Sequence, residues 1–403
     1  MIRHRGRWTQ QDRVEAIYRY LPFDVPPGTQ GITVRYRYAR AADAILDLGL
    51  ADPERVRGWS GSQRDAVVIG PRAAAPGYLP GPLPAGEWQV ILGLYRLPAD
   101  GLAFEVEVEL GAAEPAPLPA PPPRPVRPPR RDLPAELGRQ WLAGDLHTHT
   151  VHSDGALTPA ALACLAAERG LDFLAVTDHN TVAHHAELPA AGAHAGILLL
   201  PGQEVTTDEG HANALGALPW IDFREHTDTW LASTEAGGGL LSINHPVAGV
   251  HGWRRPLARR PPLVEAWHSS WDRRDATPLD WWSAHGGGAI GGSDFHHVGE
   301  DGLPGEPTTW VEAEDLAPAA ILAALRDGRV AITATQDGPV AVRCGDEIVV
   351  LDAAGTVLVG SDGFRRGIRD SRQQVPAGPG AHRLLDPSGM TLALIPAAGP
   401  GGE

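Results

Sequence analysis

The chain has 403 residues, a formal net charge of −15 and a hydrophobic content of 43%. This length allows two or three domains with buried cores, and the hydrophobic content excludes a disordered or fibrous class. The negative charge argues against a general affinity for nucleic-acid backbones or anionic membranes, although a local basic pocket could still bind one phosphate.

Every basic residue other than histidine is arginine, which excludes lysine-based chemistry. The two cysteines, Cys164 and Cys344, lie far apart in the sequence and suggest no disulfide framework. The first residues lack the apolar stretch of a secretory signal, and no later segment approaches membrane-spanning length. We therefore expect a cytoplasmic location and no membrane partner.

Residues 1–111 show the period of two that is typical of half-buried antiparallel strands. Apolar and polar side chains alternate in residues 32–38 and 102–110. Turns rich in glycine and proline separate further strands, which predicts a β-sandwich accessory domain. A packing or shielding role is favoured over glycan binding, which the aromatic residues of this segment would also allow. Residues 112–134 are proline-rich and predict a semi-rigid linker.

Residues 135–335 change to a strand, loop and helix rhythm. Apolar strands are expected at 141–148, 172–180, 197–207, 239–246, 263–269 and 288–296, with helical stretches between several of them. Repeated βα units of this size predict parallel strands and a barrel. A helix is expected at 315–328, and residues 336–403 are predicted to form a β-like, partly irregular extension.

Polar side chains stand where these strands end, and in a parallel barrel the ends of all strands open on one face. His, Asp or Glu recurs at the strand end in six successive segments, which predicts a multinuclear metal site. The residues concerned are His147, His149, Asp154, Asp178, His179, Glu204, His211, His245, Asp294 and His296. The other loop histidines are interpreted as ordinary hydrogen-bonded residues: His152, His184, His185, His194, His226 and His285.

The ligand types determine the chemistry that such a site supports. Nitrogen and carboxylate oxygen without thiolate suit Zn, Mn or Fe, and do not choose among them. A glutamate such as Glu204 can bridge two ions about 3.5–4 Å apart, and a water shared between the ions becomes a hydroxide near neutral pH. The expected reaction is hydrolysis.

Several motifs together resemble the PHP (polymerase and histidinol phosphatase) superfamily over about residues 140 to 335. They are D-L-H-x-H-x-x-x-S-D-G from Asp145, T-D-H-N from Thr177, G-x-E-x-T from Gly202, G-H-x-N-x-L-G from Gly210, N-H-P from Asn244 and G-S-D-F-H from Gly292. The sequence of residues 204–216 is most similar to that of the carbaryl-hydrolase-like CehA/McbA branch.

The resemblance implies an α/β fold, a distorted (β/α)7 TIM-like barrel, that holds two or three divalent metal ions. It implies that the first ion is bound by His147, His149, Glu204 and Asp294. It implies a second ion on Glu204, His211 and His245, and a third ion on Asp154, His179 and His296. His268 stands where relatives often carry asparagine, and its role as a supporting or substrate-contacting residue is open.

The favoured function is metal-dependent hydrolysis of a phosphoester, with Glu204, Asp294 and His268 as catalytic candidates. Arginine supplies a planar fork that suits phosphate, so Arg254 and Arg255 are further candidates, as are Arg273 and Arg274. For each arginine pair, a solvated loop charge is the competing interpretation. The expected partner is a small phosphoester or ester, including nucleotides and RNA ends, without an extended nucleic-acid surface; the oligomeric state is open.

Three alternatives remain beside this function. The CehA/McbA branch also contains carboxylic ester and carbamate hydrolases. An amidohydrolase would also begin with H-x-H, but the carbamylated lysine that often bridges its metals is impossible in a lysine-free chain. A non-catalytic metal- or glycan-binding protein is disfavoured, because all nine ligand positions carry competent residues.

Overall fold

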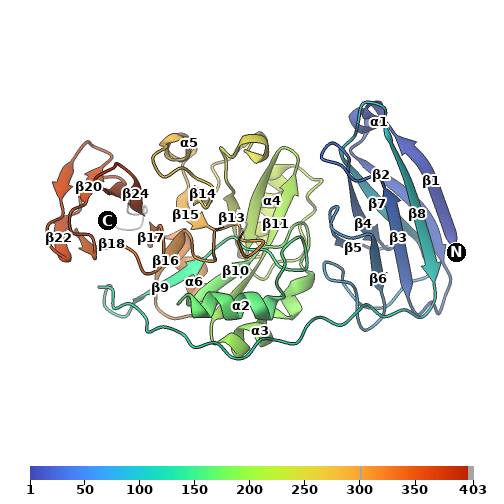
Figure 1. The fold of residues 1–403 in the computed structure, drawn as a ribbon, viewed down its shortest axis with the longest axis horizontal. Helices are drawn as coiled ribbons and strands as arrows, with labels where there is room; N and C mark the ends of the chain where they lie inside the picture. The colour runs from blue at the N-terminus through green and yellow to red at the C-terminus, as the bar shows by residue number, and fades with distance from the viewer. Residues whose placement is uncertain (300–301, 398–403) are drawn as a thin grey trace. The chain divides into compact units, whose positions relative to one another are not determined.

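The computed structural model describes residues 1–299 and 302–397 of this α/β protein. The chain divides into two compact units (Figure 1). The first unit consists of Met1–Ala120, Val151–Thr158 and Asp178–His184. The second consists of Pro121–Thr150, Pro159–Thr177 and the described residues from His185 onward. Among the described residues, none of the helices combines the length and apolar character that crossing a bilayer requires.

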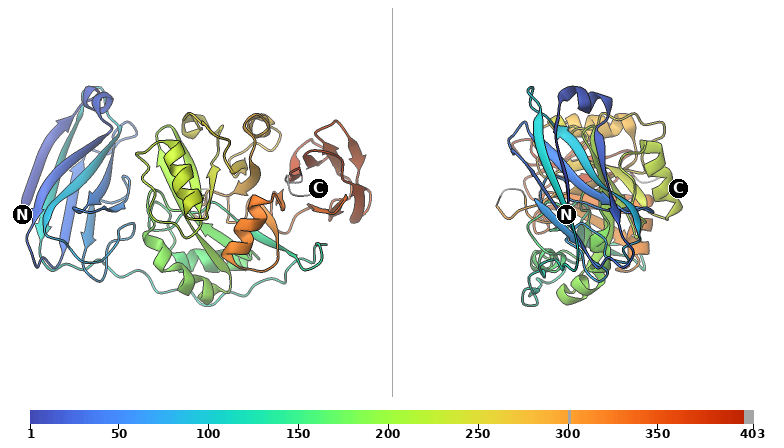
Figure 2. Two further views of the ribbon diagram at one scale, coloured as in Figure 1. Left: turned by 180° about the vertical axis from the view of Figure 1, so that it is seen from behind. Right: turned by 90° about the vertical axis from the view of Figure 1, so that its right-hand side faces the viewer.

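The N-terminal strands of the first unit form two antiparallel sheets around one core (Figure 2). One sheet has the order β1 (Ile2–Trp8), β8 (Leu102–Leu110), β3 (Ile32–Tyr38), β6 (Ala66–Ile69). The other has the order β2 (Tyr18–Val25), β7 (Gly86–Arg96), β4 (Ile45–Ala51), β5 (Val56–Trp59). The short helix α1 (Gln10–Glu15) was not expected. The alternation in 102–110 has the expected effect, because Val106 and Val108 are fully buried. This part of the chain is therefore β-rich, as predicted.

Trp88 on β7 is the largest fully buried side chain of this core. Its Nε1 donates to the carbonyl oxygen of Pro84 at 2.9 Å. Trp88→Ala is expected to lower the free energy of unfolding by about 3–5 kcal/mol, because a large cavity remains. Chemical denaturation measures this loss, with Tyr20→Ala on the same sheet as the exposed control. A loss no larger than that of the control would contradict this account of the core.

The second unit is built on a thirteen-stranded sheet. Its order is β15 (Gly288–Gly292), β14 (Leu263–His268), β13 (Leu240–Ile243), β12 (Gly210–Leu215), β11 (Leu198–Thr207), β10 (Phe173–Val176), β9 (Gln140–Asp145), β16 (Thr308–Ala313), β17 (Val330–Thr333), β24 (Thr391–Ile395), β23 (His382–Leu385), β20 (Val357–Gly360), β21 (Arg365–Gly367). The helices of the unit are α2 (Pro159–Glu168), α3 (Leu188–Ala195), α4 (Thr227–Ala236), α5 (Thr277–His285) and α6 (Pro318–Arg326).

The sheet is mixed, so the expectation of parallel strands holds for part of it. Strands β9, β10 and β11 are parallel, and so are β13, β14 and β15. Between these groups β12 is antiparallel to both β11 and β13. The turn from Thr207 to Gly210 is too short for the crossover that a parallel pair needs, which forces a hairpin. A closed seven-stranded barrel is not confirmed.

The C-terminal residues continue the sheet. The expected helix at 315–328 appears as α6, and β17 after it pairs with β24. A separate antiparallel sheet contains β18 (Val340–Cys344), β19 (Glu347–Leu351) and β22 (Arg372–Pro376). The extension from 336 onward is therefore largely β in its described residues, and the domain boundaries stay predictions.

Candidate metal centre

The segments that follow β9 and β15 are hydrogen-bonded to each other. The backbone N–H of Asp294 donates to the carbonyl oxygen of His147 at 2.9 Å, and that of His149 donates to Phe295 at 3.0 Å. An isolated parallel bridge also joins Thr148 to Phe295. Because of these contacts, the polar ends of two strands far apart in sequence lie side by side.

The first group of possible ligands consists of His147, His149, Glu204 and Asp294. The Asp294 Oδ1 atom lies 3.0 Å from Nε2 of His147 and 3.0 Å from Nε2 of His149. Glu204 Oε1 lies 3.2 Å from His147 Nε2, and Glu204 Oε2 lies 3.5 Å from His149 Nε2. One atom from each of the four side chains can thus reach a common point within the protein.

This first group fits a divalent cation. Among the described residues, neither His147 Nε2 nor Asp294 Oδ1 has a partner with hydrogen-bond geometry, although both atoms are buried. Buried polar atoms without such a partner are costly, and a shared cation would remove the cost. Two imidazole nitrogens with two carboxylate oxygens suit Zn, Mn or Fe.

Electrostatics at this group favours a cation as well. Burial disfavours the charged form of His147, but Asp294, Glu204 and Glu265 outweigh it and raise the pKa of His147 well above its ordinary value. Burial also opposes ionisation of Asp294, yet His147, His149 and His268 hold the pKa of Asp294 well below its ordinary value. Without metal, a proton therefore compensates the carboxylates, and metal binding would displace it.

Glu204 lies at the centre of the histidines. It is fully buried on β11, and its Oε1 is 3.2 Å from His211 Nδ1 and 3.5 Å from His245 Nε2. Asn244 Nδ2 donates to the same oxygen at 2.9 Å. The β11–β12 hairpin pairs Thr206 with His211, which brings His211 to Glu204. Glu204 therefore contacts predicted ligands of both the first and the second ion.

A second possible ligand group joins Glu204 and His211 with His179. The sequence prediction placed His245 in this set and His179 in another. His245 remains close to Glu204, and its ring lies 5.0 Å from that of His211. The structure thus brings His179 and His245 to the same pair, Glu204 and His211. It does not reproduce the predicted division of these histidines between two ions.

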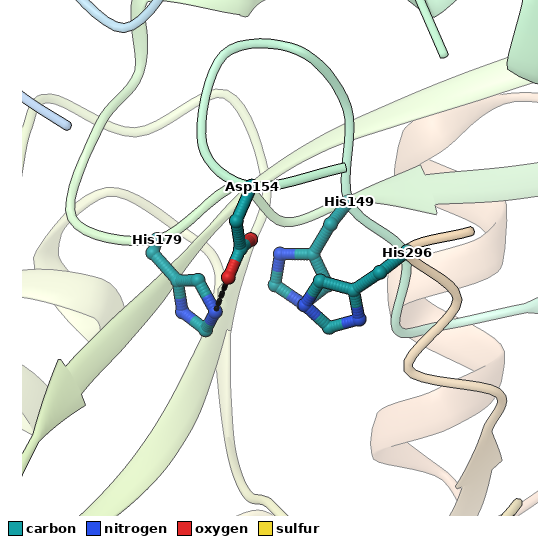
Figure 3. A group of neighbouring side chains, drawn as sticks. All are labelled: His149, Asp154, His179 and His296. Carbon is teal, nitrogen blue, oxygen red and sulfur yellow. Dashed lines mark ion pairs between the residues drawn. The ribbon is translucent and has the colours of Figure 1, made fainter. Parts of the chain in front are cut away.

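The third group consists of His149, Asp154, His179 and His296 (Figure 3). The carboxylate of Asp154 is directed at His179, with Oδ2 3.5 Å from Nε2. The rings of His149 and His296 are stacked with their centroids 4.2 Å apart. The prediction named three of these residues, and His149 is the additional member that also belongs to the first group.

Backbone conformation supports a functional role for these motifs. Of the described residues other than glycine, only Asn180, His245, Asp294 and Asp352 have positive φ. The first three belong to the T-D-H-N, N-H-P and G-S-D-F-H motifs. A positive φ at such residues costs on the order of 1–3 kcal/mol and tends to occur at functional sites.

Glu265, which the sequence analysis missed, supports the first group from behind. It is buried on β14; its Oε1 lies 3.0 Å from His147 Nδ1, and its Oε2 accepts from the His245 backbone N–H at 2.7 Å. A methyl group on Gly292 would lie 2.4 Å from Glu265 Oε1, so the glycine of G-S-D-F-H leaves room for this contact. The available signal was an acid inside the apolar strand L-V-E-A-W-H, where an unpaired charge would be costly.

Asp145 fixes the backbone of the same region and was also missed. It accepts hydrogen bonds from the backbone N–H groups of His147, Ser293 and Gly305, at 3.1, 3.0 and 2.8 Å. The aspartate of the D-L-H-x-H motif therefore stabilises the backbone around the first group.

His268 lies at the edge of the first group. Its Nε2 is 3.2 Å from Asp294 Oδ2, and its Nδ1 is 2.7 Å from Ser270 Oγ. A pocket beside it is lined by His245, Pro246, His268, Trp271, Asp272 and other residues of the same loops. His268 is therefore placed where it could contact a substrate.

Two of the four candidate phosphate-binding arginines, Arg254 and Arg255, have other contacts. Arg254 donates to the carbonyl oxygens of Val250, at 2.8 Å, and Asp208. Arg255 donates to the carbonyl oxygen of Glu225 at 2.9 Å, and its guanidinium lies 4.4 Å from the ring centroid of Trp230. These contacts account for both side chains locally, and substrate binding by either stays a prediction.

Residues 145–319 match the family model of the PHP domain. A 3',5'-nucleoside bisphosphate phosphatase of Chromobacterium violaceum is 44% identical over 79 residues, which are 19% of this chain and 28% of that protein. The 5'-3' exoribonuclease Rnm of Escherichia coli is 45% identical over 65 residues, 16% of this chain and 22% of the relative. The chain thus spans less than a third of the length of these curated relatives.

Solved structures with detectable likeness include a two-domain protein of Bacteroides vulgatus described as containing a predicted PHP-like metal-dependent phosphoesterase. It covers 66% of this chain and 98% of its own, with a TM-score of 0.44 and 17% identity. A putative metal-dependent phosphoesterase of Bifidobacterium adolescentis covers 40% of this chain and 90% of its own, with a TM-score of 0.32 and 19% identity. At these scores the structural likeness carries no argument about activity. The domain match, together with the three ligand groups, supports the PHP superfamily and divalent metal binding.

Proposed function

We propose that this chain, whose residues 145–319 match the PHP domain, is a metal-dependent hydrolase that cleaves a phosphoester. The observation that carries this proposal is the position of Glu204. Its two carboxylate oxygens lie within 3.5 Å of imidazole nitrogens that come from four different histidines: His147, His149, His211 and His245. A carboxylate so surrounded can bridge two cations.

We assign the ligands to two or three ions as the motifs indicate. The first ion would be held by His147, His149, Glu204 and Asp294, and the second by Glu204, His211 and His245. The third would be held by Asp154, His179 and His296, with His149 within reach. When bound, divalent cations polarise the ester and supply a hydroxide at neutral pH.

The remaining chemistry falls to the protein. Asp294 keeps its charge, because neighbouring histidines hold its pKa well below the ordinary value. Glu265 orients the His147 ring through Nδ1. His268 lies in the pocket with Nε2 3.2 Å from Asp294 Oδ2. We assign it the protonation of the leaving oxygen, with Ser270 holding its ring through Nδ1.

A second candidate is the carboxylic ester or carbamate hydrolysis of the CehA/McbA branch. The observation in its favour is the pocket beside His268, whose described lining residues include no arginine. Arg254 and Arg255 are engaged with nearby loops. A substrate without a phosphate would not need the planar guanidinium group of an arginine for binding.

A hydrolysis screen separates the two candidates. Metal-stripped protein would be reloaded with Mn, Zn or Fe and assayed on phosphomonoesters, phosphodiesters, cyclic nucleotides, RNA ends and carboxylic esters. We expect metal-dependent turnover of at least one phosphoester. Turnover of carboxylic esters alone would favour the second candidate, and no turnover with any metal would contradict both.

The third ion has its own prediction. Asp154→Ala and His179→Ala are each expected to lose one cation per chain while the first group keeps its metal. Elemental analysis of the purified variants measures this. His285→Ala, on the exposed end of α5, is the control and should keep the wild-type metal content. Unchanged metal content in both ligand variants would contradict the binding of a third ion.

A further inference from the structure

Two loops of the first unit carry the predicted ligands Asp154 and His179, and both contact one turn of the N-terminal strands. This turn, residues 75–78, is called the Gly77 turn; it is closed by the Tyr78 N–H donating to Ala75 at 3.0 Å. We propose that the Gly77 turn is a positioning element for the third cation. This inference rests on the proposed metal binding and adds a role for the N-terminal strands beyond the packing or shielding role that the sequence predicts.

Gly77 holds both loops through its own peptide groups. Its backbone N–H donates to His152 Nδ1 at 3.1 Å, and its carbonyl oxygen accepts from Thr181 Oγ1 at 2.9 Å. His152 stands two residues before Asp154, and Thr181 stands two residues after His179. His152 and Thr181 are both buried. One residue of the N-terminal strands therefore fixes a point next to each predicted ligand.

The approach of the turn to the loop is so close that only glycine fits. Gly77 has φ of +87°, and a methyl group on it would lie 2.5 Å from the carbonyl oxygen of His152. It would also lie 3.0 Å from the carbonyl oxygen of Trp59. Both atoms are backbone, so any side chain at this position must displace the loop that carries Asp154.

Further contacts make the turn and the two loops one assembly. Arg64 Nε donates to the carbonyl oxygen of Pro76 at 3.1 Å, and its Nη2 donates to Val151. Asp178 Oδ1 accepts from Ser153 through both the N–H, at 3.1 Å, and the Oγ, at 2.6 Å. Because the two loops are bonded to each other as well, a shift of one is passed to the other.

A cation site tolerates only small errors in ligand position, about 0.5 Å. Displacement of the 151–158 loop would therefore weaken the third cation first. The first group should be unaffected, because its members lie after β9, on β11 and after β15, outside the loops 151–158 and 178–184.

The test compares Gly77→Ala with Gly28→Ala. Gly28 also has a positive φ, +78°, but a methyl group there meets nothing within 4 Å, so it controls for the backbone cost alone. Metal-stripped full-length variants would be titrated with Mn²⁺, and bound metal counted. We expect Gly77→Ala to bind the last cation at least tenfold more weakly, with the other cations retained, and Gly28→Ala to match wild type.

Hydrogen exchange of the metal-free proteins gives a second readout. Residues 151–158 and 178–184 should exchange faster in Gly77→Ala than in Gly28→Ala. Thr181→Val carries the test if Gly77→Ala does not fold, since it removes the donor to Gly77 with little change in volume. Thr181→Ser keeps the hydroxyl and should restore the binding.

Two results would overturn the inference. A folded Gly77→Ala or Thr181→Val that binds the same number of Mn²⁺ ions with wild-type affinity would remove the positioning role and leave the proposed hydrolase intact. A wild-type chain that binds no cation would overturn both.

Discussion

Replacement of Glu204 by alanine is expected to remove bound metal and hydrolytic activity together. Glu204 is the one carboxylate within 3.5 Å of imidazole nitrogens from His147, His149, His211 and His245 among the described residues. Its loss leaves these imidazoles without a shared anion, and in the proposed assignment it would take one ligand from each of two ions. We expect the metal content to fall by at least one ion per chain and turnover to fall by about 10³-fold or more.

Glu209→Ala is the matched control for this variant. Glu209 lies in the turn of the same hairpin, and its side chain is 58% exposed. The control should keep both metal and activity. Elemental analysis and an activity assay on the same samples test the pair, and wild-type metal content in Glu204→Ala would refute the bridging assignment.

Glu265→Ala is expected to have the second largest effect. The change removes the acceptor beside His147 Nδ1 and leaves the buried His245 N–H without its 2.7 Å partner. Loss of a partner that orients a metal-binding histidine lowers metal affinity by about 10–100-fold. The buried donor adds a loss of about 1–3 kcal/mol in the free energy of unfolding.

Glu265→Gln separates these two effects. The amide oxygen can serve one of the two donors, so this variant should fall between wild type and Glu265→Ala in both metal affinity and unfolding free energy. Metal titration and denaturation of the metal-free protein measure them. Wild-type metal affinity in Glu265→Ala would show that His147 does not depend on this carboxylate.

Most of the candidate site could be predicted from the polar residues that stand at the ends of the expected strands. His147, His149, Glu204 and Asp294 lie on or just after three strands far apart in the chain, and their ligand atoms lie within 4.8 Å of one another. This prediction works because apolar runs ending in polar residues mark both the strand and the edge where it stops. It does not divide the histidines among ions, as the position of His179 beside Glu204 and His211 shows.

The roles of the features that were missed depend on tertiary contacts, which the sequence indicates only weakly. Strand β12 was not recognised, because G-H-x-N-x-L-G alternates only weakly and is buried on both sides. Glu265 is explained only once His147 and His245 are known to lie next to β14. His152 was interpreted as an ordinary loop residue, and its partner Gly77 is 75 positions away in the chain.

One titration can show whether the protein hydrolyses a phosphoester in a metal-dependent reaction. Metal-stripped protein would receive increasing Mn²⁺, and bound metal and hydrolysis of an aryl phosphate would be measured in the same samples. We expect stripped protein to be inactive and activity to rise with bound metal, reaching a plateau at about two or three ions per chain. Protein that binds less than one ion per chain, or hydrolysis that does not change as metal binds, would contradict this expectation.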